Sequence, residues 1–370
     1  PRPRPTPLRV VRATHGATVE RVLGSGDGTK TFQQFDLPDV PLTYVAANNP
    51  AGVASTLEVR VDGIRWHERA DLAHSGPHDR VYAVRHRENG TVAVMFGDGV
   101  TGARLPTGAE NVTATYRVGI GRDGLVTSGQ LSLPAIKPQG VKEVMNPAPA
   151  TDAADVDTID EAREAAPNQV MTLGRVVSLR DYEDFARNYA GVAKALASWV
   201  WVGEERRVVV SIAGTGGEEF PPGHEKLTRL EQSLWDAGDR SAIVHVVSYR
   251  PAQFILSAGV FIDPDYDQEL VLADIRGRLR SAYGFDRRAL GHPVFRSQII
   301  TDIQQTQGVI AVDLDMLDRR TANEPGNYSR LDAALPIRGE RLVGTAPADV
   351  EGAELLLLDP RPIDLEEAGA

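Results

Sequence analysis

The stretch Leu57-Glu-Val-Arg-Val-Asp-Gly-Ile-Arg-Trp66 decides the fold of the N-terminal part of the chain. Apolar and charged residues alternate up to Asp62, and this period of two predicts a half-buried strand, because successive side chains of a strand point to opposite faces. The Asp62-Gly63 pair predicts a hairpin turn, since both central residues of such a turn favour positive φ. Ile64 and Trp66 then return as the second strand of an antiparallel pair.

The same alternation recurs in later segments, which are also expected to be strands. They are residues 81–87, 92–96, 112–118 and 125–133. The Asn89-Gly90 pair between the first two predicts another turn. Residues 46–135 are therefore predicted to form an antiparallel β domain.

The segments on either side of this domain are rich in glycine and proline. Residues 1–45 are expected to form an extended N-terminal segment with few regular elements. Within it, residues 1–7 have no apolar run, so they are expected to form a polyproline-II extension and not a signal peptide. Residues 136–156 contain several prolines and are predicted to be a linker.

A helical segment is predicted at residues 157–191. It contains a helix at 158–166 and a second helix that Ser178 opens, with Asp181 three residues later as a variant of the capping box. Four apolar residues of this second helix share one face: Leu179, Tyr182, Phe185 and Tyr189. The face is a possible interface, but an amphipathic helix more commonly buries it in its own core.

Residues 192–320 alternate short strands with helices. Strands are expected at 194–202, 206–213, 242–249, 253–262 and 309–316. Helices are expected at 223–236, at 268–283 with Asp267 as its cap, and after a Ser297 cap. The core of this order, β-α-β-β-α-β, predicts a ferredoxin-like domain.

Residues 321–370 are expected to form an extended tail with one strand at 354–358. The predicted fold class is therefore α+β and multi-domain, with extended termini.

Composition narrows the possible functions. The 370 residues include 40 lysines and arginines against 51 aspartates and glutamates, a formal net charge of −11. Phosphate recognition needs a basic face, so a nucleic-acid binder is disfavoured. Cysteine is absent, which excludes disulfides and thiolate metal sites. The longest aliphatic run, Leu355-Leu-Leu-Leu358, is far shorter than the roughly 20 residues of a membrane-spanning helix, so no membrane insertion by this chain is expected.

The sequence contains no complete motif for metal or cofactor binding. Asp263, Asp265 and Asp267 alternate as in a calcium loop, but Gln268 stands where that loop needs glycine. Asp267 is more simply a helix cap. His74 and His78 are separated by Ser-Gly-Pro, which forbids a helical ligand pair. No catalytic residue, cofactor or metal is therefore expected.

The densest glycine cluster is Phe96-Gly-Asp-Gly-Val-Thr-Gly-Ala-Arg-Leu-Pro-Thr-Gly108. A phosphate-binding loop needs a helix to begin directly after it, whereas a strand is expected here at 112–118. The cluster is therefore predicted to be a wide turn between strands, in which Asp98 and Arg104 could pair.

Several of these segments together resemble the baseplate J-like family. They are residues 96–108, Asn111-Val-Thr-Ala-Thr-Tyr-Arg-Val-Gly119, Val177-Ser-Leu-Arg-Asp-Tyr-Glu-Asp-Phe-Ala186, Gly191-Val-Ala-Lys-Ala195, Gly291-His-Pro-Val-Phe-Arg-Ser297 and Gln307-Gly-Val309. The resemblance marks one turn as a family motif, with the residues Phe96, Gly97, Asp98, Gly99, Gly102, Arg104, Pro106 and Gly108.

The family contains baseplate assembly proteins of contractile phage tails and extracellular contractile injection systems. The resemblance implies a non-enzymatic wedge subunit of a six-fold baseplate, which pairs with a second wedge protein as a heterodimer or heterotrimer. It also implies contacts with the sheath-initiating protein and with the hub and spike, and a role in transmitting the contraction trigger. Such a protein would assemble in the cytoplasm and then belong to the contractile particle.

Two other functions remain open from sequence. One is a carbohydrate- or surface-binding β module with an α/β companion domain. That function requires exposed aromatic side chains on one sheet face, and Trp66 is the only tryptophan of the β region. The other is a hydrolase whose active-site residues are scattered along the chain, which would need paired carboxylates in a deep cleft.

Overall fold

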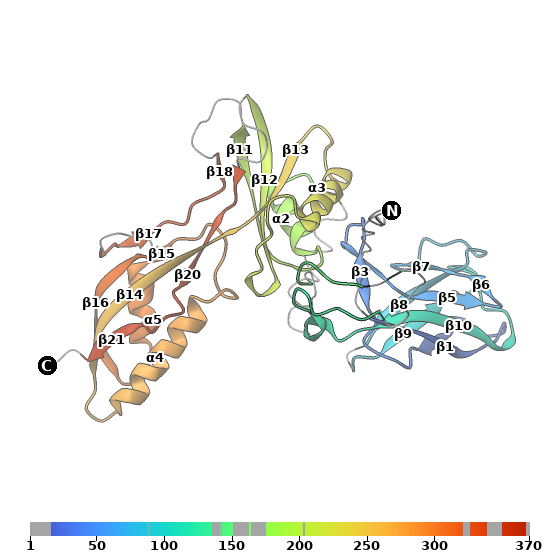
Figure 1. The fold of residues 1–370 in the computed structure, drawn as a ribbon, viewed down its shortest axis with the longest axis horizontal. Helices are drawn as coiled ribbons and strands as arrows, with labels where there is room; N and C mark the ends of the chain where they lie inside the picture. The colour runs from blue at the N-terminus through green and yellow to red at the C-terminus, as the bar shows by residue number, and fades with distance from the viewer. Residues whose placement is uncertain are drawn as a thin grey trace, which may run out of the picture. The chain divides into compact units, whose positions relative to one another are not determined.

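The computed structural model describes residues 16–87, 89–134, 141, 143–150, 163, 175–202, 204–320, 326–338 and 350–367 (Figure 1). The chain divides into two compact units. The first contains Pro1–Ala47 and Val53–Ala162, and the second contains Asn48–Gly52 and Arg163–Ala370. The mixture of mainly antiparallel sheets with a few helices confirms the predicted α+β, multi-domain class.

The first unit contains two four-stranded sheets and a two-stranded one. Its strands are β1 (Ala17–Gly26), β2 (Gln34–Asp36), β3 (Tyr44–Ala46), β4 (Val53–Ser55), β5 (Glu58–Val61), β6 (Ile64–Arg65), β7 (His67–Arg69), β8 (Val81–His86), β9 (Val92–Phe96) and β10 (Gly108–Val118). The sheet orders are β1-β10-β5-β6, β2-β9-β8-β7 and β3-β4. Every pair is antiparallel except β7 with β8.

The expected hairpin and the expected alternation are both present in this unit. Asp62 and Gly63 adopt φ values of 51° and 72° between β5 and β6, as the tight turn requires. Along β10, Val112, Ala114 and Tyr116 are buried at alternate positions. Their side chains join one core cluster with residues of β5, β8 and β9, so the two four-stranded sheets share a core.

Two expectations for this unit are wrong. The segment that was expected to hold few regular elements contains the ten-residue strand β1, which pairs with β10. Gly24 and Gly26 mark register shifts within β1, and a Cβ atom at Gly24 would lie 2.6 Å from the Phe35 ring. Gly24 thus allows Phe35 of the other four-stranded sheet to approach closely, and β1 continues past it to Gly26.

The strand expected at residues 125–133 is also not formed. A short 3₁₀ helix, η1 (Gly121–Gly124), follows β10, and the chain then makes irregular contacts with residues 146–150. The Asn146 side chain accepts from the Leu131 N–H and donates to the Thr127 carbonyl. Side-chain bonds of this kind replace the ladder that the alternating pattern predicted.

The second unit contains two larger sheets. The first has the order β11-β12-β13, in which β11 and β12 are antiparallel and β12 and β13 are parallel. Its elements are α2 (Leu179–Arg187), β11 (Val192–Val202), β12 (Glu205–Gly214), the 3₁₀ turn η2 (Thr215–Gly217), α3 (Glu225–Ala237) and β13 (Ile243–Ser248). The apolar faces of α2 and α3 pack with residues of all three strands in one core.

The second sheet of this unit is built on the thirteen-residue strand β14 (Arg250–Ile262). β14 pairs antiparallel with β16 (Val309–Arg319) and parallel with β20 (Glu354–Leu358) and β21 (Asp364–Glu367). The helices α4 (Gln268–Ala282) and α5 (Arg296–Gln304) cover one face of this sheet (Figure 1). Short pairs join β15 (Val294–Phe295) to β17 (Arg330–Leu331) and β18 (Ile337–Arg338) to β19 (Val350–Glu351).

The predicted ferredoxin-like sheet does not form, because its strands divide between two sheets. Among the described strands, β13 pairs only with β12, whereas β14 pairs with β16 and with the C-terminal strands. The division falls at Tyr249, the single residue between β13 and β14. Element order does not specify which strands share hydrogen bonds, and here the C-terminal strands occupy the edge of β14 that a single sheet would have used.

The C-terminal region is also more regular than expected. β20 has the predicted bounds 354–358, but β17, β18, β19 and β21 were not predicted. Leu355 and Leu356 of β20 are fully buried. The tail is therefore part of the core of the second unit.

Two of the predicted helix caps, Ser178 and Asp267, bond to the first turn of their helices, whereas the third, Ser297, is not an N-cap. Ser178 and Asp181 form the reciprocal bonds of a capping box, and Asp267 accepts from the Leu270 N–H at 3.1 Å. The helix α5 begins one residue before Ser297, and its N-cap Phe295 makes no side-chain bond. The chain enters α5 directly from β15, which leaves Ser297 inside the first turn. The helix expected at 158–166 lies outside the described residues, apart from residue 163.

We predict that β20 contributes strongly to the stability of the second unit. Replacement Leu356→Ala should lower the free energy of unfolding by about 2–5 kcal/mol, since it leaves a cavity among fully buried side chains. The matched control Leu270→Ala alters a side chain of α4 that is 68% exposed and should change that energy by less than about 0.5 kcal/mol. Urea denaturation followed by circular dichroism measures both, and equal effects would contradict the assignment of β20 to the core.

Candidate functional site

The glycine-rich turn at residues 96–108 is held together by its own hydrogen bonds. The Asp98 carboxylate accepts from the N–H groups of Val100 and Thr101 at 2.9 and 2.7 Å and from the Thr101 hydroxyl at 3.1 Å. These bonds, with the Thr101 N–H the strongest, lower the pKa of Asp98 below its ordinary value. The carboxylate therefore closes the turn as an anion.

Arg104 crosses the same turn, but its partners differ from the expected one. Its Nε and Nη2 atoms donate to the backbone carbonyl of Asp98 at 3.1 and 2.8 Å, and Nη1 donates to the Gly28 carbonyl at 3.4 Å. The guanidinium thus fastens two loops through backbone oxygens and not through the Asp98 carboxylate.

The glycines of the turn are required by close packing. A Cβ atom at Gly97 would lie 2.3 Å from the Gly102 carbonyl oxygen. Gly99 and Gly102 adopt φ values of 89° and 86°, which residues with a side chain rarely reach. The Gly99 N–H donates to the Gly102 carbonyl and the Ala103 N–H donates to the Asp79 carbonyl, so these amides are already used within the protein.

The two ends of the turn are joined to the core and to β1. Phe96 is fully buried, and its ring meets that of Trp66 edge to face at 5.4 Å. Asn111 accepts from the Gly26 N–H at 2.8 Å and donates to the Pro106 carbonyl at 3.3 Å. Gly108, which begins β10, lies against the Asn111 side chain. The turn is thus a structural joint within the first unit.

The apolar face of α2 lies inside the second unit. Tyr182, Phe185 and Tyr189 are at most 5% exposed, and Leu179 is partly buried against the same core. Burial raises the pKa of both tyrosines. The alternative of an interface on this face is therefore wrong, because the helix covers its own sheet.

Two histidines, one of them a ligand candidate from sequence, have structural explanations. His74 lies 3.7 Å from Asp71, and in the part of the chain that the structure describes no group of three acidic or histidine residues could hold a metal ion. His245 contacts Glu231 at 3.1 Å. Burial alone would raise the pKa of Glu231, but bonds from His245 and from the Val246 N–H outweigh it and lower the pKa.

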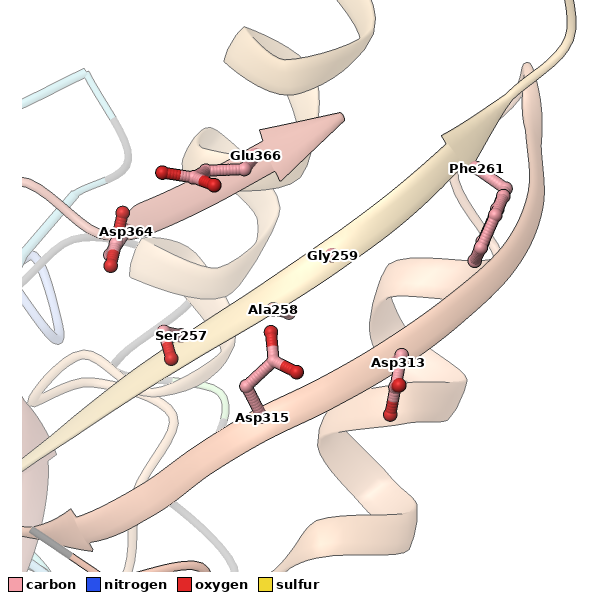
Figure 2. A pocket seen from close by; sticks show the side chains of 8 residues that line it. All are labelled: Ser257, Ala258, Gly259, Phe261, Asp313, Asp315, Asp364 and Glu366. Carbon is pink, nitrogen blue, oxygen red and sulfur yellow. The ribbon is translucent and has the colours of Figure 1, made fainter. Parts of the chain in front are cut away.

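An acidic hollow lies on the face of the second sheet that α4 and α5 leave open. Figure 2 shows carboxylates from β16 and β21 on either side of β14. Its lining residues are Ser257, Ala258, Gly259, Phe261, Asp313, Asp315, Asp364 and Glu366. Arg296 reaches Asp313 at 4.0 Å, whereas Asp315, Asp364 and Glu366 form no ion pair with any described residue. The hollow was not predicted, because its strands are about fifty residues apart in sequence.

Chemically, this hollow presents charge of one sign on the open face of the second sheet. Its carboxylates face solvent from strands on either side of a glycine, so no side chain separates them at the centre. Such a surface favours a cationic partner over a phosphate or another anion.

Comparison with known proteins assigns a family to one part of the second unit. Residues 174–247 match the family model described as the baseplate J-like central domain. This segment is therefore similar to baseplate J-like central domains. It contains α2, β11, β12, α3 and most of β13, so the domain corresponds to the first sheet of the unit with both of its helices. The motif segments at 177–186 and 191–195 lie within it, which confirms the resemblance recognised from sequence.

Comparison of whole structures gives a distant match to a solved structure. The cryo-EM structure of the anti-feeding prophage (AFP) baseplate, 6-fold symmetrised, contains a chain that is 12% identical to this one. The match covers 92% of this chain and 76% of that chain, with a TM-score of 0.39. No curated protein matches the chain. None of the described helices is long and apolar enough to cross a membrane.

We predict that the glycine-rich turn stabilises the first unit through its close packing. Replacement Gly97→Ala should lower the free energy of unfolding by about 1–3 kcal/mol, because the new methyl group forces the backbone at Gly102 to move. Gly277→Ala in α4, where a Cβ meets no atom within 4 Å, should instead raise it by about 0.5–1 kcal/mol. Scanning calorimetry compares the two. A neutral Gly97→Ala would show that the turn is looser than these contacts imply.

Proposed function

We propose that this protein is a structural subunit of the baseplate of a contractile injection system. The observation that carries the proposal is the baseplate J-like central domain at residues 174–247. The motif residues support a structural role, since those of the turn hold the first unit together and those of α2 form the core of the second. These groups are used for stability and not for substrate chemistry.

Within that role, we further propose that the protein is a wedge subunit. It would pair with a second wedge protein, contact the sheath-initiating protein and the hub and spike in a six-fold assembly, and help to transmit the contraction trigger. The net charge of −11 supports partners with basic surfaces, and the open acidic face of the second sheet is one place where they could bind.

A carbohydrate-binding β module has less support. Sugar-binding sheets present exposed aromatic rings, but Trp66 is 4% exposed and packs on Phe96 in the core. The one tryptophan of the β region is therefore part of the core of the first unit and not of an exposed sheet face.

The proposed function predicts co-assembly. When the protein is expressed together with the sheath, tube and spike genes of its own source, it should purify with the sheath–tube particle and occupy a position at one end in cryo-EM maps. A chain that folds but is consistently missing from intact particles would refute the proposal. A glycan array run on the same preparation distinguishes the carbohydrate-binding alternative.

The acidic face predicts a specific electrostatic contribution to that assembly. The double variant Asp364→Asn/Glu366→Gln should reduce incorporation into particles several-fold at low salt, and the difference should shrink at high salt because ions screen surface charges. The control Asp274→Asn/Glu219→Gln removes the same net charge at exposed positions elsewhere in the unit. If both variants incorporate equally, overall charge and not this face is responsible.

A further inference from the structure

The strand β11 forms one edge of the three-stranded sheet β11-β12-β13. In an antiparallel pair, alternate residues direct both their N–H and C=O groups away from the partner strand. The Ala197 N–H points away from β12, because it donates to the Glu183 carboxylate of α2 at 3.1 Å. By the same alternation, the backbone groups of Trp199 and Trp201 face the open edge.

Glu183 provides a hydrogen-bond acceptor for the backbone of this edge at Ala197. Among the described residues, no strand pairs with the outer edge of β11, opposite β12, and no backbone partner is present for the N–H groups of Trp199 and Trp201. Exposed edges of this kind accept an added strand unless charged side chains, proline or a covering element protect them. Here the two edge residues are tryptophans, which give no such protection.

The side chains at this edge form an exposed apolar surface with one positive charge. Trp199 and Trp201 are 40% and 61% exposed and project to the same face of the sheet, because they are two residues apart. Arg206 lies opposite Trp201 in the pairing of β11 with β12, and its guanidinium stacks over the Trp199 ring at 4.2 Å. Arg206 forms no ion pair with any described residue.

The opposite face of the same strands is occupied, which distinguishes the two sides. Val200 packs with Val209 and with Val350 of β19. Among the described residues around Trp199 and Trp201, only the tryptophan side and the outer edge are therefore open, whereas α2 and α3 cover that same face from Ala197 inward. We call Trp199, Trp201 and Arg206, with the backbone edge of the two tryptophans, the β11 edge site.

We propose that the β11 edge site binds an extended, acidic segment of a partner protein, which adds as a strand beside Trp199 and Trp201. The unpaired backbone groups select an extended chain, as in β-strand addition. The indole rings cover apolar side chains of that segment at alternate positions, and tryptophan and arginine are the residues most often found at binding hot spots. The unpaired Arg206 selects a carboxylate, and its stacking on Trp199 holds the charge in place.

The test uses the full-length chain and a random-peptide display library as the probe. Selected peptides should alternate apolar with acidic residues, and the strongest of them is then titrated by calorimetry. Trp201→Ala and Arg206→Glu should each weaken its binding at least ten-fold. The control Trp235→Ala removes a tryptophan of α3 that, like Trp199, is 40% exposed and stacked with an arginine, here Arg240, and it should change binding less than two-fold.

Amide hydrogen exchange distinguishes strand addition from side-chain docking. The peptide should slow exchange at the Trp199 and Trp201 amides. The Val200 amide points toward β12, so its exchange should already be slow in the free protein. Unchanged exchange at the two tryptophans, helical or basic selected peptides, or equal loss of binding in Trp235→Ala would each overturn the proposal. So would a dimer of the free chain that Trp201→Ala dissolves, because the occupant would then be a second copy. The assay uses the isolated protein, so its result does not depend on whether the chain enters a baseplate particle.

Discussion

The second unit depends on the close passage of its C-terminal segment past the end of β13. A Cβ atom at Gly352 would lie 2.0 Å from the Ser248 carbonyl oxygen, so only glycine fits there. The next residue, Ala353, donates its N–H to the buried Ser211 hydroxyl of β12 and accepts from the Arg250 N–H of β14. One segment therefore bonds to both sheets of the unit. On either side of it, β19 packs against the first sheet and β20 completes the second.

Because both units depend on contacts between segments far apart in the chain, only some of their features could be predicted from sequence. The Asp62-Gly63 hairpin, the alternation of β10 and the Ser178 and Asp267 caps depend on residues within a few positions of one another, and local patterns reveal them. Sheet membership depends on partners far along the chain. β14 finds β20 about a hundred residues later, and β1 finds β10 about ninety residues later. Glycines such as Gly24 and Gly352 look like loop residues in sequence, but here they permit close contacts inside the fold.

The same limit applies to the candidate sites. The turn at 96–108 was recognised because its residues are contiguous, although the partner of Arg104 proved to be a backbone carbonyl. The acidic face could not be recognised, since Asp315 and Glu366 meet only through their shared neighbour β14. The β11 edge site has a local signal in sequence, namely two tryptophans at alternate positions followed by Arg206. Its meaning depends on burial, because the same spacing would equally suit a buried strand.

The acidic face and the β11 edge site, both on the second unit, have opposite charge preferences. The acidic face on β14, β16 and β21 favours cationic partners, whereas Arg206 at the β11 edge favours an acidic one. Like charges placed opposite one another cost binding energy, so each surface rejects the partner of the other. A subunit with such a pair of surfaces accepts two different neighbours, each at its own place. This placement of two different neighbours arises from the local separation of charge within the unit. The net charge of −11 does not produce it, because net charge alone would favour basic partners everywhere.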